Sequence, residues 1–352
     1  MHTLAMFGFG GMAGIHHKVL TNDYDKIQVK GVYDIDNKRM DAAKEKGLVA
    51  YLSKEDLLND NEVDIVLVAT TNDSHKELCI DALNAGKHVI CEKPATMCAD
   101  DLVEIIECAK KNNKVFTIDQ NRRVNKDFVL MRRTVESGII GKPYVIESRV
   151  EGSRGLPSGW REKKAQGGGM MLDWGVHLID QIMYMIDEKV VNVFCKMLSL
   201  NYPEVDDNFR LTLTFESGLI AHIEVSTNNF ISHPRWYVLG TDGTLQIDDW
   251  SCEGKVVKCL DKENSWGVDI VSTKAGPSKT MAPRSEDTVE TIKLSAPCDV
   301  MDNLVPTYEQ FLDAIDNGAE LKIKPEEALR VIKVMEAAFL SSEKCETVKT
   351  NI

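Results

Sequence analysis

A short apolar strand that runs directly into glycines is the feature that most limits how this chain can fold. Residues 4–7 form the expected strand, and Gly8, Phe9, Gly10, Gly11, Met12 and Ala13 follow it, before an apolar segment that ends near Leu20. This is the pattern G-x-G-x-x-A. Its first glycine allows a tight turn, its second lets a pyrophosphate approach the backbone, and its third small residue lets a helix pack on the strand. Free N–H groups at the start of that helix would then face the phosphates, so the sequence predicts a dinucleotide-binding unit.

The acidic residue that such a unit requires follows at the expected spacing. Residues 27–33 predict a second strand, which ends at Asp34, about 20 positions after the small residue of the glycine pattern. A carboxylate there bonds the adenosine ribose hydroxyls, and Asp36 adds a charge that would repel the 2′-phosphate of NADP. NAD is therefore the expected cofactor, although Arg39 leaves some tolerance of NADP open. The alternative role for Asp34 is to cap the helix that follows.

Strands and helices alternate as far as residue 119. We expect helices over 38–46, from Ser53, up to Ala85 and over 100–111, strands over 64–69, 87–91 and 114–119, and a short element near 49–52. This alternation predicts a doubly wound parallel sheet. Ligands bind outside the carboxyl ends of the strands in such a sheet, which is where Glu92, Lys93 and Pro94 would lie. Taken alone, these three residues fit a charged turn equally well.

Length and composition limit the class of protein. A chain of 352 residues suggests two domains of about 150 residues each. The formal net charge of −13 argues against a general nucleic-acid or acidic-membrane binder. There is no signal peptide and no apolar stretch of membrane-spanning length, and the nine cysteines form no C-x-x-C pair. We therefore expect a soluble, cytoplasmic protein with reduced thiols.

These motifs together resemble the Gfo/Idh/MocA family, which includes glucose–fructose oxidoreductase and inositol dehydrogenase. The residues that carry the resemblance are Gly8–Gly14, Asp34, Thr70-Thr71-Asn72 with His75, residues 85–89 with Glu92-Lys93-Pro94, Gln120-Asn121-Arg122-Arg123, and Gly167–His177. Thr71 departs from the proline that is frequent in the family. The resemblance implies an α/β chain with an NAD-binding Rossmann domain over 1–121. It implies an α+β substrate-binding and oligomerisation domain with an open, largely antiparallel sheet over 122–352, whose terminal helix can pack back on the first domain.

The second half of the chain reads differently from the first. We expect helices over 128–137, 300–317 and 325–342, and strands over 143–150, 190–197, 209–215, 219–225 and 236–239, with a hairpin turn at 241–244. Apolar and polar residues alternate strictly in two of these strands, which predicts antiparallel strands with one half-polar face. The resemblance implies that this face associates subunits into a homo-oligomer. Residues 262–297 are weakly patterned, and we expect a long loop or an irregular hairpin there.

An aspartate and a histidine lie four positions apart in an apolar segment of the second half. Gly167-Gly168-Gly169 is the expected flexible entry to a helix on which Asp173 and His177 share one face. The apolar residues around them argue against a solvent-exposed pair, and they indicate inward-facing groups suited to proton transfer. A two-residue metal site has no evident third ligand, so we expect no metal.

The resemblance implies an oxidoreductase that moves a hydride between a secondary alcohol of a sugar, glycoside or cyclic polyol and the nicotinamide of NAD. His177 is the expected general base, since imidazole titrates near neutral pH. Lys93 would offset negative charge on the reacting oxygen, and Asp173 would orient His177 or bind a neighbouring hydroxyl. The expected cofactor-binding residues are Gly8, Phe9, Gly10, Gly11, Met12, Ala13, Asp34, Ile35, Arg39, Thr70, Thr71, Asn72, His75, Glu92, Lys93 and Gln120. The expected substrate-binding residues are Arg123, Trp160, Arg161, Asp173, His177 and Trp236, of which Arg123, Trp160, Arg161 and Trp236 fit structural roles equally well.

Several alternatives stay open from the sequence. The enzyme alternatives are an inositol 2-dehydrogenase, a keto-sugar reductase, and a glycoside-processing enzyme that oxidises C3 of a glucoside to a 3-keto sugar. Long loops around Trp160 would accommodate a substituent, which favours glycosides over free polyols. The alternative from another class is a non-catalytic NAD-sensing regulator, which would not need a lysine, an acid and a histidine together.

Overall fold

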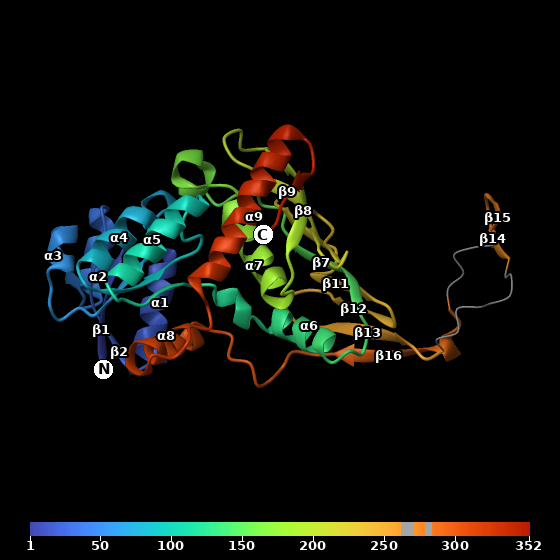
Figure 1. The fold of residues 1–352 in the computed structure, drawn as a ribbon, viewed down its shortest axis with the longest axis horizontal. Coiled ribbons are helices and arrows are strands. Elements are labelled where there is room, and N and C mark those ends of the chain that lie inside the picture. The colour runs from blue at the N-terminus through green and yellow to red at the C-terminus, as the bar shows by residue number, and fades with distance from the viewer. Residues whose placement is uncertain (262–269, 279–283) are drawn as a thin grey trace.

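The computed structural model describes residues 1–261, 270–278 and 284–352, and it contains two large sheets with helices on and between them (Figure 1). The first sheet has six parallel strands in the order β3-β2-β1-β4-β5-β6. They are β1 (His2–Phe7), β2 (Ile27–Tyr33), β3 (Val49–Ala50), β4 (Ile65–Val68), β5 (His88–Cys91) and β6 (Phe116–Ile118). The helices between them are α1 (Gly11–Asn22), α2 (Asn37–Glu45), α3 (Lys54–Leu58), α4 (His75–Asn84) and α5 (Ala99–Lys111).

This strand order explains where a ligand can enter. The chain winds outward from β1 to β3 on one side and from β4 to β6 on the other, so neighbouring connections leave in opposite directions between β1 and β4. In open α/β sheets that switch point opens a crevice at the carboxyl ends of the strands. Every residue of β4 is buried, as a strand covered by helices on both faces requires. The predicted doubly wound parallel sheet is therefore confirmed.

The second sheet has nine strands in the order β16-β13-β12-β11-β7-β10-β9-β8-β17, and every neighbouring pair is antiparallel except β7 with β10. The strands are β7 (Pro143–Glu151), β8 (Val190–Leu198), β9 (Asn208–Phe215), β10 (Ile220–Ser226), β11 (Trp236–Gly240), β12 (Gly243–Ile247), β13 (Gly254–Cys259), β16 (Val289–Leu294) and β17 (Val348–Lys349). The largely antiparallel sheet and the hairpin turn between β11 and β12 are confirmed.

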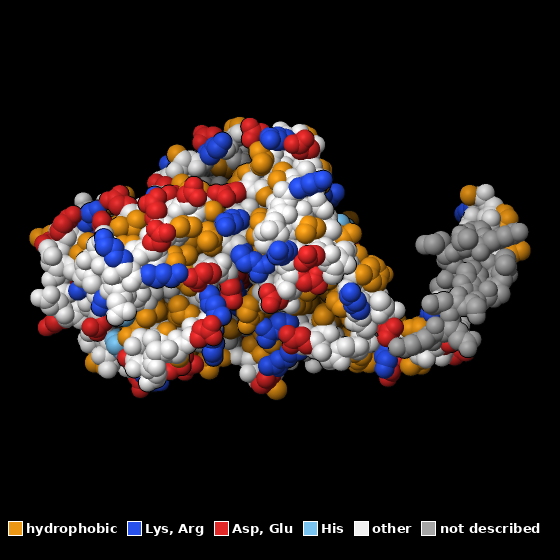
Figure 2. Space-filling model, in the orientation of Figure 1, with side chains coloured by type: hydrophobic (Ala, Val, Ile, Leu, Met, Phe, Trp, Pro, Cys, Tyr) orange, Lys and Arg blue, Asp and Glu red, His pale blue; other side chains and the backbone are white. Residues whose placement is uncertain are grey.

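One face of the second sheet is apolar and the other is polar. Leu211, Leu213 and Phe215 of β9 are buried on the inner face, which packs against α7 (Val176–Met185) and α9 (Pro325–Lys344). Helix α6 (Lys126–Glu136) packs near β12. The outer face presents Arg210 and His222. Figure 2 shows acidic and basic side chains interspersed over the visible face of the molecule. No helix of the described part is both long and apolar enough to cross a membrane.

The last helices return to the first sheet. In α8 (Val305–Asn317), Tyr308 and Phe311 are fully buried in one cluster with Leu4 and Met6 of β1. Helix α9 packs on α5 and β6 as well as on β8 and α7, and Figure 1 shows it crossing between the two sheets. The C-terminal segment therefore fixes the two halves of the chain against each other.

The expectation of a long loop or an irregular hairpin over 262–297 is confirmed in part, since residues 271–278 form a hairpin, and it is wrong for residues 289–294, which form a strand of the second sheet. Residues 262–269 and 279–283 lie outside the described residues. The rest contains a two-stranded hairpin of β14 (Val271–Thr273) and β15 (Gly276–Ser278), a short 3-10 turn at Glu286–Thr288, and β16. Strand β16 pairs with β13 at the edge of the sheet. An edge strand buries little of its surface and often carries charges, which is why its pattern is weak in the sequence.

Candidate active site at the junction of the two sheets

The glycine turn after β1 has the geometry that a pyrophosphate needs. Gly8 has a φ of +86°, and a Cβ there would lie 2.5 Å from the carbonyl oxygen of Ala69, so only glycine fits. Its N–H donates to the carbonyl of Tyr33 at 2.8 Å. Gly10 is the N-cap of α1 and supplies no side chain to bond the first N–H groups of Gly11 and Met12. Ala13 is fully buried, which lets α1 lie close to the strand. The N–H groups of Gly11 and Met12 are therefore free to bind an anion.

Asp34 lies beside this turn at the end of β2. Its carboxylate accepts hydrogen bonds from the N–H groups of Phe9 at 2.7 Å and Asp36 at 2.8 Å. Arg39 also donates to it, at 3.3 Å. The N-cap of α2 is Asp36, which accepts from the N–H of Lys38, so the capping alternative for Asp34 is wrong. These three bonds use three of about four acceptor positions of the carboxylate, so one is left for a ribose hydroxyl. The neighbouring Ile35 is 92% exposed and offers apolar surface to an adenine.

The segment after β4 joins the two halves of the chain. The side-chain amide of Asn72 donates to the carbonyl of Gly167 at 2.8 Å. The hydroxyls of Thr70 and Ser74 lie 2.7 Å apart and order the backbone around Thr71. His75 is fully buried, and its ring nitrogens lie 2.9 Å and 3.4 Å from the carbonyl oxygens of Pro94 and Thr70. His75 therefore fixes the turn after β5 and has no free ring atom for a cofactor, which corrects its predicted role.

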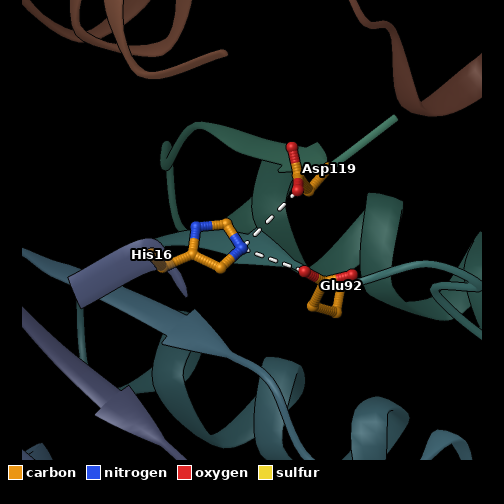
Figure 3. A group of neighbouring side chains, drawn as sticks. All are labelled: His16, Glu92 and Asp119. Atoms are coloured by element: carbon orange, nitrogen blue, oxygen red, sulfur yellow. Dashed lines mark hydrogen bonds and ion pairs between the residues drawn. The ribbon is translucent and has the colours of Figure 1, made fainter. Parts of the chain in front are cut away.

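Figure 3 shows a buried ionic cluster of His16, Glu92 and Asp119. Nε2 of His16 lies 2.9 Å from Oε1 of Glu92 and 3.5 Å from Oδ2 of Asp119, and Nδ1 of His16 lies 2.5 Å from the hydroxyl of Tyr308. Burial opposes protonation of His16, but the bond to Glu92 and the charge of Asp119 outweigh it and raise its pKa. Burial and the charge of Glu92 raise the pKa of Asp119 to about 6.

This cluster changes the interpretation of Glu92. The other oxygen of Glu92 accepts from the N–H of Lys93 at 3.2 Å, and Glu92 is only 5% exposed. Glu92 is therefore a buried anchor for the end of β5, which corrects its predicted contact with the cofactor. His16, Glu92 and Asp119 lie close enough together to hold a metal ion, but the ion pairs among them already account for their arrangement. Gln120, by contrast, keeps a buried side-chain oxygen that has no hydrogen-bond partner in the described part of the chain, which fits an acceptor for a cofactor amide.

Lys93 and Asp173 meet across the junction of the two halves. Nζ of Lys93 donates to the backbone carbonyl of Asp173 at 2.8 Å and to its Oδ1 at 3.0 Å. Nε of Arg161 donates to Oδ2 of Asp173 at 2.9 Å. Burial favours the neutral form of Asp173, but Lys93 and Arg161 outweigh it and lower its pKa to about 2. The carboxylate is therefore ionised at neutral pH.

His177 lies one turn further on and is 4% exposed. Its Nδ1 has no hydrogen-bond partner among the described residues. Burial, together with the charges of Lys93, Arg122 and Arg235, lowers the pKa of His177 well below its usual value. The imidazole is therefore neutral and able to accept a proton.

The predicted pairing of Asp173 with His177 does not occur. Both side chains are buried among apolar residues as expected, but the described structure contains no hydrogen bond or ion pair between them. Asp173 lies in a single π-helical turn, Met171–Gly175, and α7 begins only at Val176. This turn breaks the regular α-helical spacing that the prediction assumed. Asp173 is directed to Lys93 and Arg161 instead.

Two of the four weaker substrate candidates lie outside the site. The guanidinium of Arg123 is buried and donates to both oxygens of Asp180, at 2.7 and 2.6 Å, and to Glu327. Trp236 is fully buried, and its indole N–H donates to Asp127 at 2.8 Å. Neither side chain has a free face for a sugar, so both are structural. Trp160 and Arg161 are partly exposed and stack on each other, with the guanidinium carbon 4.5 Å from the ring centroid.

A cavity of about 460 Å³ opens beside Asp173. Its lining includes Glu151, Arg154, Asp173, Trp174 and Thr227. This volume lies within the range of small-molecule sites. Sequence reasoning missed Trp174 and Glu151, although Trp174 is adjacent to Asp173 and Glu151 ends β7. Local patterns could not show that these segments meet at one cavity.

Comparison with known proteins gives the same assignment for both halves of the chain. Residues 3–120 match the model of an oxidoreductase family with an NAD-binding Rossmann fold, and residues 128–246 match the GFO/IDH/MocA C-terminal domain. A myo-inositol 2-dehydrogenase of Thermotoga maritima is 30% identical over 254 residues, which are 70% of this chain and 75% of that protein. An NADP(+)-dependent scyllo-inositol 2-dehydrogenase of Bacillus subtilis is 24% identical over 98% of this chain and 95% of that protein. The crystal structure of an NAD-binding protein from Listeria innocua has a TM-score of 0.88 at 43% identity, covering 99% of this chain and 97% of the other.

Proposed function

The chain belongs to the Gfo/Idh/MocA family of NAD-binding oxidoreductases, and from that premise we propose that it oxidises or reduces one carbon of a sugar, glycoside or cyclic polyol. The carbon would alternate between a secondary alcohol and a ketone. The observation that carries this proposal is the meeting of Lys93, Asp173 and a neutral His177 at the carboxyl end of β5. Binding of NAD alone would not require this arrangement.

Each residue has a role that follows from its environment. In the oxidative direction the imidazole of His177 accepts the hydroxyl proton, because its lowered pKa keeps it neutral. The ammonium group of Lys93 donates to the same oxygen and offsets the negative charge that develops on it. The bound nicotinamide supplies the acceptor for the hydride that leaves the carbon. The proton on His177 and the hydride together account for the two hydrogens that the alcohol loses.

Asp173 has two functions in this proposal. It holds the ammonium group of Lys93 in place through two contacts, and its charge is shared with Arg161. A substrate hydroxyl next to the reacting carbon would bond the same carboxylate, since the cavity opens beside it. Arg161, which bonds Asp173, and Trp160, which lies against Arg161, would contact a substituent on the sugar. A glycoside oxidised at C3 would carry such a substituent.

The Rossmann half would hold the cofactor as follows. The pyrophosphate would bind at Gly8–Met12, the ribose at Asp34, the adenine at Ile35 and Arg39, and the nicotinamide near Thr70, Thr71, Asn72 and Gln120. Asp34 accepts from Arg39 in this structure, so part of the charge of Arg39 is already neutralised. Preference for NAD over NADP is therefore proposed, in contrast to the NADP(+) named for the Bacillus subtilis relative.

The polar outer face of the second sheet suggests a further proposal on assembly. It displays Arg149, Arg210, His222 and Glu224 around a shallow hollow of about 360 Å³. We propose that this face associates subunits into a homo-oligomer with closed symmetry.

The test is a screen of the purified protein with NAD against sugars, methyl glycosides and inositols, followed by NADH absorbance. His177→Ala should abolish most turnover with any substrate found, whereas a control substitution, His2→Ala at the amino end of β1, should leave it unchanged. Failure of every substrate in both directions, with NAD bound, would contradict the proposal and favour a regulator. Turnover that survives in His177→Ala would remove His177 from the mechanism.

A further inference from the structure

Two consecutive arginines after β6 have different environments. Arg123 donates to the carboxylates of Asp180 and Glu327 and is fully paired. The side chain of Arg122 makes no hydrogen bond or ion pair with any residue that the structure describes, and its Nε is buried without a partner. Burial lowers the pKa of Arg122, and Asp127, Asp173 and Asp302 act on it only from a distance. A largely buried guanidinium without a carboxylate is costly unless a ligand pairs with it.

Two tryptophans hold the guanidinium of Arg122 in a fixed plane. Its central carbon lies 4.1 Å from the ring centroid of Trp174 and 5.7 Å from that of Trp250. The two indole rings lie 5.9 Å apart. Stacking engages the face of a guanidinium and leaves its edge N–H groups unused, and these edge groups form the fork that matches a carboxylate or a phosphate. The stack is therefore compatible with anion binding and prepares it.

The position of Arg122 links this fork to the reacting groups. Trp174 also lines the cavity beside Asp173, and its ring centroid lies 6.0 Å from that of His177. Arg122 is one of the cations whose charge lowers the pKa of His177. An anion bound to Arg122 would therefore lie a few atoms from a carbon that reacts at His177.

The charges around His177 favour an anionic ligand. Lys93, Arg122, Arg161 and Arg235 are the cations of this region, and their close acidic partners are Asp173 and Asp127. The nearest further carboxylate of the cavity, Glu151, is engaged with the backbone and the ring of His233. The charges that act on His177 are all positive, those of Lys93, Arg122 and Arg235, inside a chain whose net charge is −13. An anionic substrate would offset this positive charge, and a neutral polyol would not.

We propose that Arg122 binds an anionic group of the substrate, a carboxylate or a phosphate, so that the enzyme acts on acidic sugars in preference to neutral ones. The inference rests on the proposed oxidoreductase function and specifies its substrate class. The anion would form two parallel hydrogen bonds with the edge of the guanidinium, while Trp174 and Trp250 exclude water from them. The acid could be a uronate or a sugar phosphate, since both present oxygens to the same fork.

The experiment compares three ligands that share their ring hydroxyls at C2, C3 and C4. They are methyl glucoside, the corresponding methyl glucuronide and methyl glucoside 6-phosphate. Their binding to the NAD complex is followed by tryptophan fluorescence, because Trp174 and Trp250 flank the site, and their turnover is followed by NADH absorbance. At least one acidic ligand should bind about tenfold or more tightly than the neutral one, which corresponds to about 1.4 kcal/mol.

The variants identify the residue responsible. Arg122→Met should remove the preference for the acid by raising its Kd and KM, with little change for the neutral ligand, and Arg122→Lys should restore part of it. Arg132→Met is the matched control, since Arg132 also lies over an aromatic ring, that of Tyr184, at 5.2 Å, but on α6 away from the cavity. That control should keep the preference.

The outcomes separate this inference from the proposed function. Equal binding of all three ligands, binding of none, or a preference that survives in Arg122→Met would overturn the anion site. Turnover of the neutral glycoside without a preference for acids would leave the oxidoreductase function standing alone. Tight binding of an acid that depends on Arg122, without turnover in either direction, would support the anion site and count against catalysis.

Discussion

Replacing Asp173 by asparagine removes the charge that joins the two halves of the chain. Asp173→Asn keeps the shape of the side chain and the backbone carbonyl that accepts from Lys93 at 2.8 Å. It loses the ionic part of the contacts with Lys93 at 3.0 Å and Arg161 at 2.9 Å. The variant therefore isolates the energetic role of one carboxylate.

The expected magnitude follows from the pKa of Asp173. Lys93 and Arg161 lower it from 3.8 to about 2. Each pKa unit corresponds to about 1.4 kcal/mol, so ionisation stabilises the folded state by about 2 kcal/mol. The side chain is 10% exposed, so solvent screening reduces this value only slightly. Asp173→Asn should lower the free energy of unfolding by about that amount at neutral pH.

The pH dependence has a definite sign. The pKa of the folded state lies below that of the unfolded state, so the stabilisation is complete above pH 3.8 and disappears as the pH falls toward 2. The difference between the two proteins should be the same at pH 7.5 and pH 5, and it should shrink by about half at pH 3.

Urea unfolding of the NAD-free protein, followed by circular dichroism, measures this difference. Asp73→Asn, which changes an exposed carboxylate, is the control for loss of one negative charge and should have little effect. A difference below about 0.5 kcal/mol at pH 7.5, or one that grows on acidification, would refute the reasoning, because a buried pair should exceed the value of a surface ion pair.

Four further predictions follow from the site. NAD should bind at least about tenfold more tightly than NADP in calorimetric titration, and Asp34→Ala should narrow that gap; equal affinities would contradict the assignment of Asp34. Lys93→Ala should lower kcat by about 10²–10³ and His177→Ala by about 10²–10⁴ with NAD binding retained, and the double variant should be much less than multiplicatively worse in steady-state kinetics. Light scattering should give a multiple of 39.4 kDa, and a monomer mass across the micromolar range would contradict the proposed assembly. In pH–rate profiles, the acid limb of kcat/KM should lie below pH 6.5. With an acidic substrate, the acid limb of kcat should lie at higher pH than that of kcat/KM.

The cofactor side of the site was predictable because its rules are local. Gly8 must adopt a positive φ and meet the carbonyl of Ala69, and Asp34 must follow one strand later; both requirements act within a single strand–helix–strand unit. The roles of His75 and Glu92 were not predictable in this way. Their partners are backbone carbonyls of a turn and a histidine of α1, and only the folded chain brings these together.

The substrate-binding half of the site shows more clearly what local sequence patterns cannot predict. Arg122 and Arg123 are identical in type and adjacent, but the carboxylates that pair with Arg123 lie 57 and 204 positions away along the chain. No local pattern shows which arginine faces Asp180 and which faces Trp174. The π-helical turn at Met171–Gly175 could not be predicted from local patterns either, because its extra residue depends on packing and not on helix propensity. Sequence therefore identified the segment that carries Asp173 and His177 but not their partners.

The charges around His177 have a consequence for the direction of proton transfer. Burial and three cations, Lys93, Arg122 and Arg235, lower the pKa of His177, so a proton taken from an alcohol is held weakly. The neutral imidazole is therefore a weak base unless a negative charge enters with the substrate. An anion on Arg122 would cancel one of the three cations and raise the pKa of His177 in the complex, which would make the imidazole a stronger base for oxidation. The pH dependence of kcat/KM reports the enzyme without substrate, whereas that of kcat reports the complex. With an acidic substrate, the acid limb of the kcat profile should therefore lie at higher pH than that of the kcat/KM profile. With a neutral substrate, the two limbs should coincide. If the acid limbs of kcat and kcat/KM lie at the same pH for the acidic substrate, its charge does not change the pKa of His177.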